Sequence, residues 1–208
     1  MKCNDLNKLG GALSEGQALI LPTETVYGIF AQALHPQSVE HVYELKGRPK
    51  YKALNLNVAD LSTIIHYSEN QPLYLKELYE SFLPGPLTII LKANHLVPEW
   101  INAGLDSIGF RVPNHPVTLQ LIKEYGPLVG PSANKSGQQS GTIFYEIETE
   151  LGTELMGWSD DASISGFDST ILDLTGPRAR ILRQGQISKE ELESKIPGLV
   201  IEEGEDQL

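Results

Sequence analysis

The sequence lacks most of the residue patterns that mark a familiar binding or catalytic site. A single cysteine, Cys3, excludes an internal disulfide and fits a reducing compartment. The P-loop pattern G-x-x-x-x-G-K-[ST], the dinucleotide pattern G-x-G-x-x-G and the hydrolase elbow G-x-S-x-G are all absent. A nucleotide bound by this chain must therefore be held without these loops.

The histidines give no sign of a metal centre. None of the five has a second histidine or a cysteine at ligand spacing, so no metal site is expected. Each is interpreted as a surface or helix-end residue. They are His35, His41, His66, His95 and His115.

Long apolar runs are also missing. The longest, over 18–21 and 87–91, have the length of strands, so no membrane span is expected. No apolar segment of the signal-peptide kind follows Met1. The sequence therefore predicts a cytoplasmic protein with no membrane partner.

The charge is strongly acidic but unevenly placed. A formal net charge of −11 argues against a uniformly basic nucleic-acid binder, since affinity for phosphate backbones comes mainly from Lys and Arg. Four of the 16 basic residues nevertheless fall within seven positions, at Lys46, Arg48, Lys50 and Lys52. This cluster indicates either a local anion site or a solvated basic loop.

Apolar spacing predicts helices and strands in alternation along the chain. Helices are predicted over 5–15, 36–46, 73–82, 115–125 and 145–151 and after Ser188, and strands over 18–21, 54–58, 87–92, 107–112, 128–130, 169–174 and 180–182. The 208 residues, of which 40% are apolar, suit one mixed α/β (α+β) domain with a twisted mixed β-sheet flanked by helices. The acidic segment 202–208 is predicted to be a frayed tail.

Three segments in the first half of the chain carry side chains that suit a core poorly. Segment 22–28 follows a buried strand, where sites in α/β sheets often lie, and an ordinary turn is the alternative. Segment 46–52 offers guanidinium and ammonium donors that suit phosphate oxygens. Segment 84–88 is interpreted as a turn, because two prolines flank a glycine.

In the strand over 107–112, polar and apolar residues divide cleanly between the two faces. Ser107, Gly109 and Arg111 share one face, and the opposite face is apolar. Arg111 is therefore predicted to face a cavity or solvent.

Two further segments offer small polar groups. Ser132 and Asn134 stand near glycines, which permit close approach of a ligand, although a polar surface loop is the alternative. Ser169 begins one predicted strand and Arg183 follows another, whose pattern does not show which side faces the core. An exposed edge strand is the alternative there.

Together these segments resemble the YrdC-like family. Its K-x-R and S-x-N signature is present as Lys46-Gly47-Arg48 and Ser132-Ala133-Asn134. Further segments that look like the family are 22–28, 84–88, 111–113, 169–171 and 183–185. The likeness runs from about residue 9 to 185 and implies a single YrdC-like domain over 1–208, with a YrdC/RibB-like fold and a concave ligand-binding face.

The resemblance implies a threonylcarbamoyl-AMP synthase, which is a nucleotidyltransferase. L-threonine, bicarbonate and ATP with Mg²⁺ would give L-threonylcarbamoyl-adenylate and pyrophosphate, and other proteins would use that product to modify adenosine in tRNA. A displacement at phosphorus needs positioning and charge neutralisation more than a protein nucleophile. That requirement fits a site of Lys, Arg, Ser and Asn side chains without a histidine base.

Site residues carry over from the resemblance position by position. Lys46 and Arg48 look like the catalytic cations. The residues similar to threonine contacts are Thr25, Tyr27, Asn57, Arg111, Ser132 and Ser169. Those similar to ATP contacts are Arg48, Lys52, Ser107, Asn134, Thr142 and Arg183. Mg²⁺ is expected to be held mainly by phosphate and water, without a protein cage or structural metal.

The chain departs from the family pattern at two positions. Ala53 replaces a proline that usually follows the lysine at position 52, and Asn57 replaces a histidine. An asparagine can still donate and accept hydrogen bonds, but it does not titrate near neutral pH. These changes bear on how the amino acid is selected.

Two alternatives stay open at the level of sequence. One is a non-catalytic RNA-binding paralogue that acts on tRNA or ribosomes through the cluster over 46–52. The other is a carbamoyl-transfer module of the HypF type, although the zinc-finger and acylphosphatase parts of such proteins are absent from this chain.

Overall fold

The computed structural model describes residues 1–152 and 155–202 of the chain. Its helices are α1 Leu6–Ser14, α2 Pro36–Lys46, α3 Leu61–Tyr67, α4 Leu75–Phe82, α5 Glu99–Asn102, α6 Pro116–Tyr125, α7 Phe144–Leu151 and α8 Lys189–Lys195, with one 3₁₀ turn, η1 Asp161–Ser163. Its strands are β1 Leu19–Pro22, β2 Tyr27–Gln32, β3 Leu56–Asn57, β4 Ser68–Glu69, β5 Leu87–Ala93, β6 Ser107–Arg111, β7 Leu128–Val129, β8 Met156–Gly157, β9 Thr170–Asp173 and β10 Arg180–Arg183.

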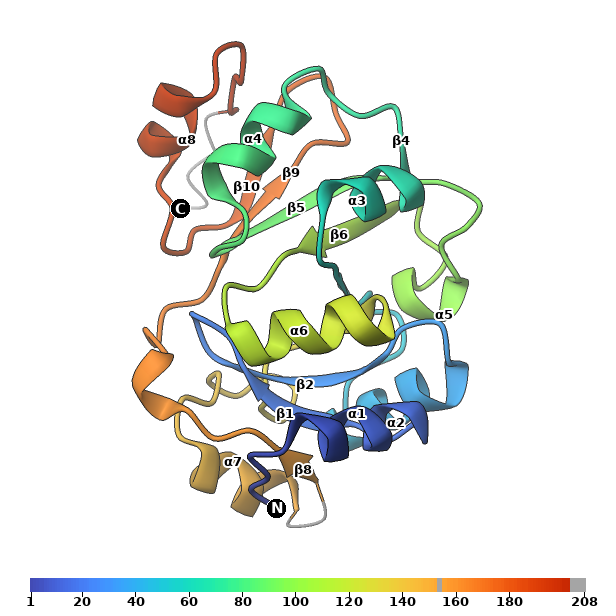
Figure 1. The fold of residues 1–208 in the computed structure, drawn as a ribbon. Coiled ribbons are helices and arrows are strands. Elements are labelled where there is room, and N and C mark those ends of the chain that lie inside the picture. Colours follow the sequence, from blue (N-terminus) through green and yellow to red (C-terminus); the bar gives the residue numbers. More distant parts are fainter. Residues whose placement is uncertain (153–154, 203–208) are drawn as a thin grey trace.

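The strands form one mixed sheet that runs through the whole molecule. Their order is β10-β9-β5-β6-β3-β7-β2-β1-β8, and β4 adds to β5. The pairs β3–β6, β5–β9 and β1–β8 are parallel, whereas the remaining pairs are antiparallel. Figure 1 shows α4 and α8 at one end of the molecule and α7 with β8 at the other. The predicted single-domain mixed α/β fold is confirmed.

The hairpin β1–β2 is buried on both faces. Leu19, Leu21 and Phe30 point into a core that α1 and α6 cover. Ile20 and Ile29 point the other way, into the larger core. Figure 1 shows α6 lying in front of β2 with α1 beside it. The alternation follows from the period-two geometry of a strand.

Local signals fix the ends of several helices. Asp5 caps α1 by accepting hydrogen bonds from two backbone amides. Pro36 opens α2, and Gly47 closes it in the left-handed conformation at φ 56°, which glycine adopts without strain. Ser188 caps α8 by accepting from the Glu191 amide at 3.1 Å, as its sequence predicts. A Cβ at Gly10 would lie 2.0 Å from the Tyr125 hydroxyl, so this glycine permits the close packing of α1 on α6.

Most predicted helices and strands are present, although some are shorter than predicted. The structure also contains several elements that the sequence did not predict. The strand over 54–58 pairs only at Leu56–Asn57. Strand β2 was not predicted, because burial on both faces removes the polar–apolar alternation that marks a strand. The short elements α3, β4, α5, β8 and η1 were also missed. The predicted acidic tail lies outside the described residues from 203 onward.

No helix within the described ranges is long and apolar enough to cross a membrane.

Candidate active site

A cavity of about 340 Å³ opens on one face of the sheet, where β3, β5, β6 and β9 lie side by side. Seven of the predicted site residues line it: Tyr27, Arg48, Asn57, Arg111, Ser132, Ser169 and Arg183. They come from segments up to 156 positions apart in the chain (183 minus 27). The fold therefore brings the separate motifs of the sequence to one place.

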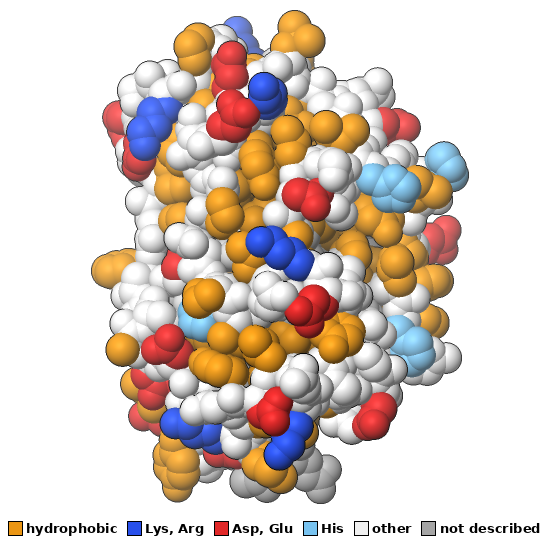
Figure 2. Space-filling model, in the orientation of Figure 1, with side chains coloured by type: hydrophobic (Ala, Val, Ile, Leu, Met, Phe, Trp, Pro, Cys, Tyr) orange, Lys and Arg blue, Asp and Glu red, His pale blue; other side chains and the backbone are white. Residues whose placement is uncertain are grey.

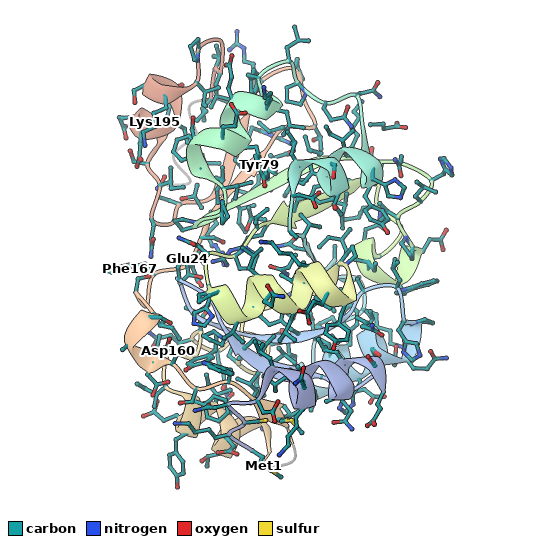
Figure 3. The ribbon with its side chains drawn as sticks, in the orientation of Figure 1. Met1, Glu24, Tyr79, Asp160, Phe167 and Lys195 are labelled. Carbon is teal, nitrogen blue, oxygen red and sulfur yellow. The ribbon has the colours of Figure 1, made fainter. Side chains whose placement is uncertain are left out.

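Arg111 is fixed at the end of β6 by the loop between β1 and β2. Its Nη2 donates to the Thr25 hydroxyl at 2.6 Å and to a Glu24 carboxylate oxygen at 2.9 Å. The other Glu24 oxygen accepts from the Asn114 amide at 2.8 Å, and Figure 3 marks the position of Glu24. The buried Nε of Arg111 has no hydrogen-bond partner among the described residues. The guanidinium of Arg111 is thus held in the cavity wall with one buried donor unsatisfied by the described part of the chain.

Lys46 lies behind the cavity wall and not in it. Its side chain is 2% exposed at the end of α2. The ammonium donates to the Ser132 carbonyl, to the Asn134 carbonyl at 2.6 Å and to Asn134 Oδ1 at 3.3 Å. Burial, together with the nearby Arg48 charge, lowers the pKa of Lys46 to about 8. The two halves of the K-x-R and S-x-N signature are therefore in direct contact.

Arg48 lines the cavity, whereas the next lysines along the loop do not. The Arg48 guanidinium donates to the Lys52 carbonyl at 3.1 Å and to the Ala53 carbonyl at 2.7 Å. Burial lowers its pKa from the ordinary value. Lys50 and Lys52 are both exposed, and Lys50 pairs with Glu40 at 2.6 Å. Lys52 is thus placed beside the cavity mouth by its backbone, but its side chain does not line the cavity.

Arg183 reaches the cavity from the exposed edge strand β10. It donates to the Ser169 carbonyl and to the Ser169 hydroxyl, each at 3.1 Å, and its Nη1 lies 3.4 Å from an Asp168 oxygen. The strand is exposed along most of its length, which agrees with the edge-strand alternative. Arg183 shows that an edge strand can also supply a side chain to a site.

Two asparagines of the segment over 54–58, which was predicted as a strand, face the cavity. Asn57 is 3% exposed, and its amide makes no hydrogen bond to the described part of the chain. Asn55 also lines the cavity, and a Cβ on Gly109 would lie 2.2 Å from its Oδ1. A Cβ on Gly130 would lie 2.7 Å from Asn57 Nδ2. Both glycines make room for amides that a ligand can use.

Six predicted site residues do not line the cavity. Thr25, Lys46 and Asn134 contact residues that do. Lys52 is exposed, and Thr142 is half-buried near Gly166. Ser107 shares the face of Arg111 but lies at the opposite end of β6, about 13 Å along the strand at ~3.3 Å per residue. The direct roles assigned to these residues stay predictions.

Tyr27 lines the cavity, but its hydroxyl is committed elsewhere. The hydroxyl donates to Asp161 Oδ1 at 2.7 Å and accepts from the Asp160 amide at 2.8 Å. Figure 3 places Asp160 below Glu24, on the segment that leads to η1. Burial and the Asp161 carboxylate raise the pKa of Tyr27 above its ordinary value. Tyr27 therefore contributes wall and anchorage, not a free hydroxyl.

Some cavity residues were missed in the sequence. Thr88 follows Pro86 in a segment interpreted as a turn, yet its hydroxyl lies 3.1 Å from that of Ser169 inside the cavity. Thr88 lies two residues before Ile90 in strand β5, and alternate side chains of a strand share a face. Because Ile90 also lines the cavity, this spacing was the available signal. Thr23, Asn55 and Asp168 also line the cavity. Thr23 lies in segment 22–28 and Asn55 in the predicted strand over 54–58, whereas no sequence pattern distinguished Asp168.

The residues around the cavity offer little to a bare metal ion. Among the described residues no group of three His, Cys, Asp or Glu side chains could hold one. Asp168 is the one carboxylate among the lining residues of the described chain, and Arg183 and Ser140 already contact it. Any Mg²⁺ would therefore take most of its ligands from a bound phosphate and from water.

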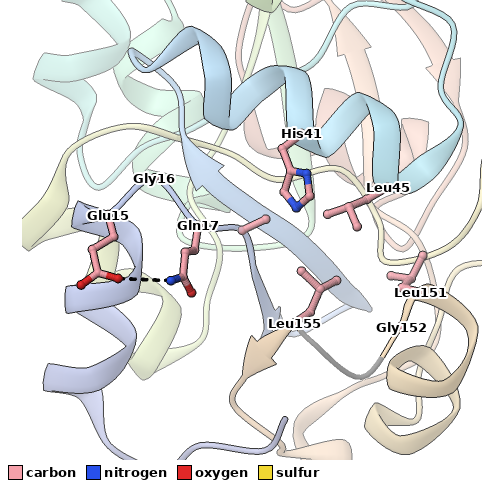
Figure 4. Close-up of a pocket in the computed structure, with 9 residues that line it drawn as sticks. Glu15, Gly16, Gln17, His41, Leu45, Leu151, Gly152 and Leu155 are labelled. Atoms are coloured by element: carbon pink, nitrogen blue, oxygen red, sulfur yellow. Dashed lines mark hydrogen bonds between the residues drawn. The ribbon is translucent and has the colours of Figure 1, made fainter.

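A larger hollow of about 650 Å³ lies elsewhere, between α1, α2 and the end of α7 (Figure 4). Its described lining includes Leu45, Leu151 and Leu155, and a hydrogen bond of 3.2 Å joins Gln17 to Glu15. It contains none of the predicted site residues. Because ligand sites are marked by convergent polar groups, the smaller cavity is the candidate active site.

Comparison with known proteins agrees with this choice. The family model described as Telomere recombination, which covers the Sua5, YciO and YrdC proteins, matches residues 11–185. The chain belongs to the Sua5/YciO/YrdC family. Residues 11–185 include every candidate site residue named above.

Several relatives of the Sua5/YciO/YrdC family carry the name threonylcarbamoyl-AMP synthase. The chain is 37% identical to the one from Bacillus subtilis over 196 residues, 92% of this chain and 56% of the relative. It is 35% identical to the one from Pyrococcus abyssi over 188 residues, 89% of this chain and 55% of the relative. The chain thus spans about half the length of these two relatives. For the one from Vibrio campbellii, 33% identity covers 84% of this chain and 95% of the relative.

Solved structures of the family share the fold. Pyrococcus abyssi Sua5 in complex with L-threonine matches with a TM-score of 0.87 and 33% identity, over 95% of this chain and 58% of that chain. Escherichia coli YciO matches with a TM-score of 0.76 over 86% of this chain and 88% of that chain. At 22% identity, the second likeness shows the fold alone.

Proposed function

We propose that this chain is an L-threonylcarbamoyladenylate synthase, an enzyme of the nucleotidyltransferase class. Three arginines, Arg48, Arg111 and Arg183, converge on one cavity together with serine hydroxyls. This convergence is the observation that carries the proposal. The relatives with that name and the Sua5 complex with L-threonine support the choice of substrates.

The amino-acid half of the site would lie at the end of β6. Arg111, which Glu24 and Thr25 hold in the cavity wall, would pair with the substrate carboxylate. Ser132 and Ser169 would offer hydroxyls to the amino acid. The Asn57 amide, which faces the cavity, would gain a hydrogen-bond partner from it.

The nucleotide half would lie between Arg48 and Arg183, which both line the cavity. Arg48 donates to two backbone carbonyls of its own loop, and Arg183 donates to the Ser169 carbonyl, so both are held in place before a ligand arrives. Lys52 would add a third cation, and Asn134, Ser107 and Thr142 would complete the nucleotide contacts. Preorganised cations of this kind stabilise charge that develops on transferring phosphoryl groups.

The chemistry would need positioning more than a protein nucleophile. The threonine amine and bicarbonate form a carbamate with loss of water. A carbamate oxygen then attacks the α-phosphorus of ATP, the bond to the β-phosphate oxygen breaks, and pyrophosphate leaves. Arg48 and Arg183 would neutralise the phosphates during this step. Mg²⁺, held mainly by phosphate and water, would supply further charge on the phosphates when bound.

A pyrophosphate-release assay tests this function. We expect release from ATP to require both L-threonine and bicarbonate, and the adenylate product to appear by mass spectrometry. Serine, which keeps the hydroxyl, and valine, which keeps the shape, serve as matched amino acids. Equal release with all three, or none with threonine, would reject the assignment.

The product would act outside this chain. A threonylcarbamoyl group on AMP is an activated acyl group, so a second protein must transfer it to adenosine in tRNA. Other tRNA threonylcarbamoyl-modification proteins are therefore proposed partners, and the cytoplasm is the proposed compartment.

A second candidate, RNA binding without catalysis, has one observation in its favour. Lys50, Tyr51 and Lys52 are exposed together on one loop, and an aromatic ring between cations suits single-stranded RNA. Against it, the formal net charge is −11, and affinity for phosphate backbones comes mainly from Lys and Arg. On the face in view, Figure 2 shows acidic and basic side chains interspersed. RNA binding that is sensitive to salt and survives saturation with ATP would favour this candidate.

A further inference from the structure

Lys46 stands out because it is charged, almost fully buried and absent from the cavity wall. It is the last residue of α2, two positions before Arg48, which does line the cavity. An ammonium has three N–H donors and no acceptor. Because its three oxygen contacts are the Ser132 carbonyl, the Asn134 carbonyl and Asn134 Oδ1, no donor is left for a phosphate.

The segment that Lys46 contacts is itself a closed hydrogen-bond network. The Ser132 hydroxyl donates to Asn134 Oδ1 at 2.5 Å, and Asn134 Nδ2 donates to the carbonyls of Lys135 and Gln138. The backbone completes the connection, because the Ser136 amide donates to the Lys46 carbonyl at 2.8 Å. The end of α2 and the loop over 132–138 therefore form one unit with the ammonium at its centre.

The charges around Lys46 suit a structural cation. Arg48 lies close enough to lower the Lys46 pKa, and Glu150 on α7 acts in the opposite direction. Two carbonyl oxygens and an amide oxygen face the ammonium directly, and such charge-assisted hydrogen bonds are stronger than neutral ones. Removing the ammonium would leave these three oxygens without this donor inside the protein.

We propose that Lys46 is a positioning residue for both substrates and not a phosphate ligand. It fixes the positions of Ser132, on the amino-acid side, and Asn134, on the nucleotide side, relative to Arg48. This inference rests on the proposed function, because it assigns Ser132 and Asn134 to the two substrates. The two basic residues of the K-x-R motif therefore have different roles. Arg48 faces the ligand, whereas Lys46 holds the loop over 132–138.

The distinction can be measured through L-threonine binding in the absence of nucleotide. A phosphate ligand contributes nothing to that equilibrium, whereas a residue that positions Ser132 does. We expect Lys46→Met to weaken L-threonine binding about tenfold by calorimetry, and ATP binding by a similar factor. Lys50→Met is the matched control, since Lys50 is an exposed cation of the same loop, and it should leave L-threonine binding unchanged.

Lys46→Gln provides the conservative variant, because its amide keeps two donors at the end of a shorter stem. It should lose less L-threonine affinity than Lys46→Met. Unchanged L-threonine affinity in Lys46→Met, with or without a loss of ATP affinity, would overturn the proposal. Failure of both variants to fold would also overturn it, since the contacts would then serve the fold and not the site. Wild-type protein that binds no L-threonine would instead count against the proposed function.

Discussion

Of the two hollows in this molecule, the smaller one has the side chains that suit a ligand site. The larger, about 650 Å³, is lined by leucines and by polar groups such as Gln17 and Glu15 that already bond each other. The smaller, about 340 Å³, gathers three guanidiniums and an amide without a partner in the described chain. Unused donors, not volume, distinguish a site that can bind an anion.

The two hollows also differ in the residues that support their lining side chains. Behind the smaller cavity, Glu24 and Thr25 hold Arg111 through hydrogen bonds of 2.9 and 2.6 Å, and Lys46 donates to the Ser132 carbonyl. In the larger hollow, Leu45, Leu151 and Leu155 present apolar side chains, which can make no hydrogen bond of this kind. A supported wall is what a preorganised site requires.

The largest expected effect comes from Arg111→Lys. Lysine keeps the charge beside Glu24 but cannot present the forked donors of a guanidinium. We expect L-threonine affinity to fall about 100-fold, or about 2.7 kcal/mol, while ATP affinity changes less than threefold. Calorimetric titration measures both. A loss of ATP affinity alone would move the amino acid away from Arg111.

A pH experiment tests the buried state of Lys46. Its folded pKa of about 8 lies below the ordinary lysine value of 10.5, so between these limits the unfolded chain binds a proton that the native one lacks. Stability from this group therefore rises with pH over that window. We expect wild type to gain about 2 kcal/mol relative to Lys46→Met between pH 7.5 and 9.5 in urea unfolding. An unchanged difference would show an ordinary pKa.

Arg48→Ala should act on the nucleotide more than on the fold. The side chain is half-buried and donates to two backbone carbonyls, so we expect a stability loss of about 1 kcal/mol. ATP affinity should fall about tenfold, and the loss should shrink as salt rises. Thermal unfolding and ATP titration of the same variant decide the matter. A large drop in melting temperature with full ATP affinity would make Arg48 structural.

The smallest effect is expected in the larger hollow. His41→Ala removes a side chain that lines this hollow (Figure 4) and does not line the candidate active site. Both substrate affinities should stay within twofold, or about 0.4 kcal/mol, of wild type. If His41→Ala weakened either substrate more than Arg48→Ala does, the choice between the two hollows would be reversed.

Much of the fold was predictable because its signals are local. The cap at Ser188, the proline and glycine that bound α2, and the two-faced strand over 107–111 all depend on neighbours in the chain. Strand β2 was not predicted because it is buried on both faces, so its pattern resembles an apolar loop as much as a strand. The short elements were not predicted because segments of two to seven residues show too little apolar periodicity.

The site was predictable where a side chain is costly to bury and where a family motif marks it. Arg111 met both conditions, and it lines the cavity. Thr88 was missed because a threonine in a strand needs no explanation beyond packing. The position of Lys46 was missed for another reason: its motif places it near an anion, and only the fold shows that backbone oxygens occupy its donors.

The most direct test is a crystal structure of the protein with L-threonine and a non-hydrolysable ATP analogue bound together. We expect both ligands in the 340 Å³ cavity, with the amino-acid carboxylate on Arg111 and the phosphates between Arg48 and Arg183. Ligands bound in the larger hollow, or phosphates that contact none of these arginines, would contradict the assignment.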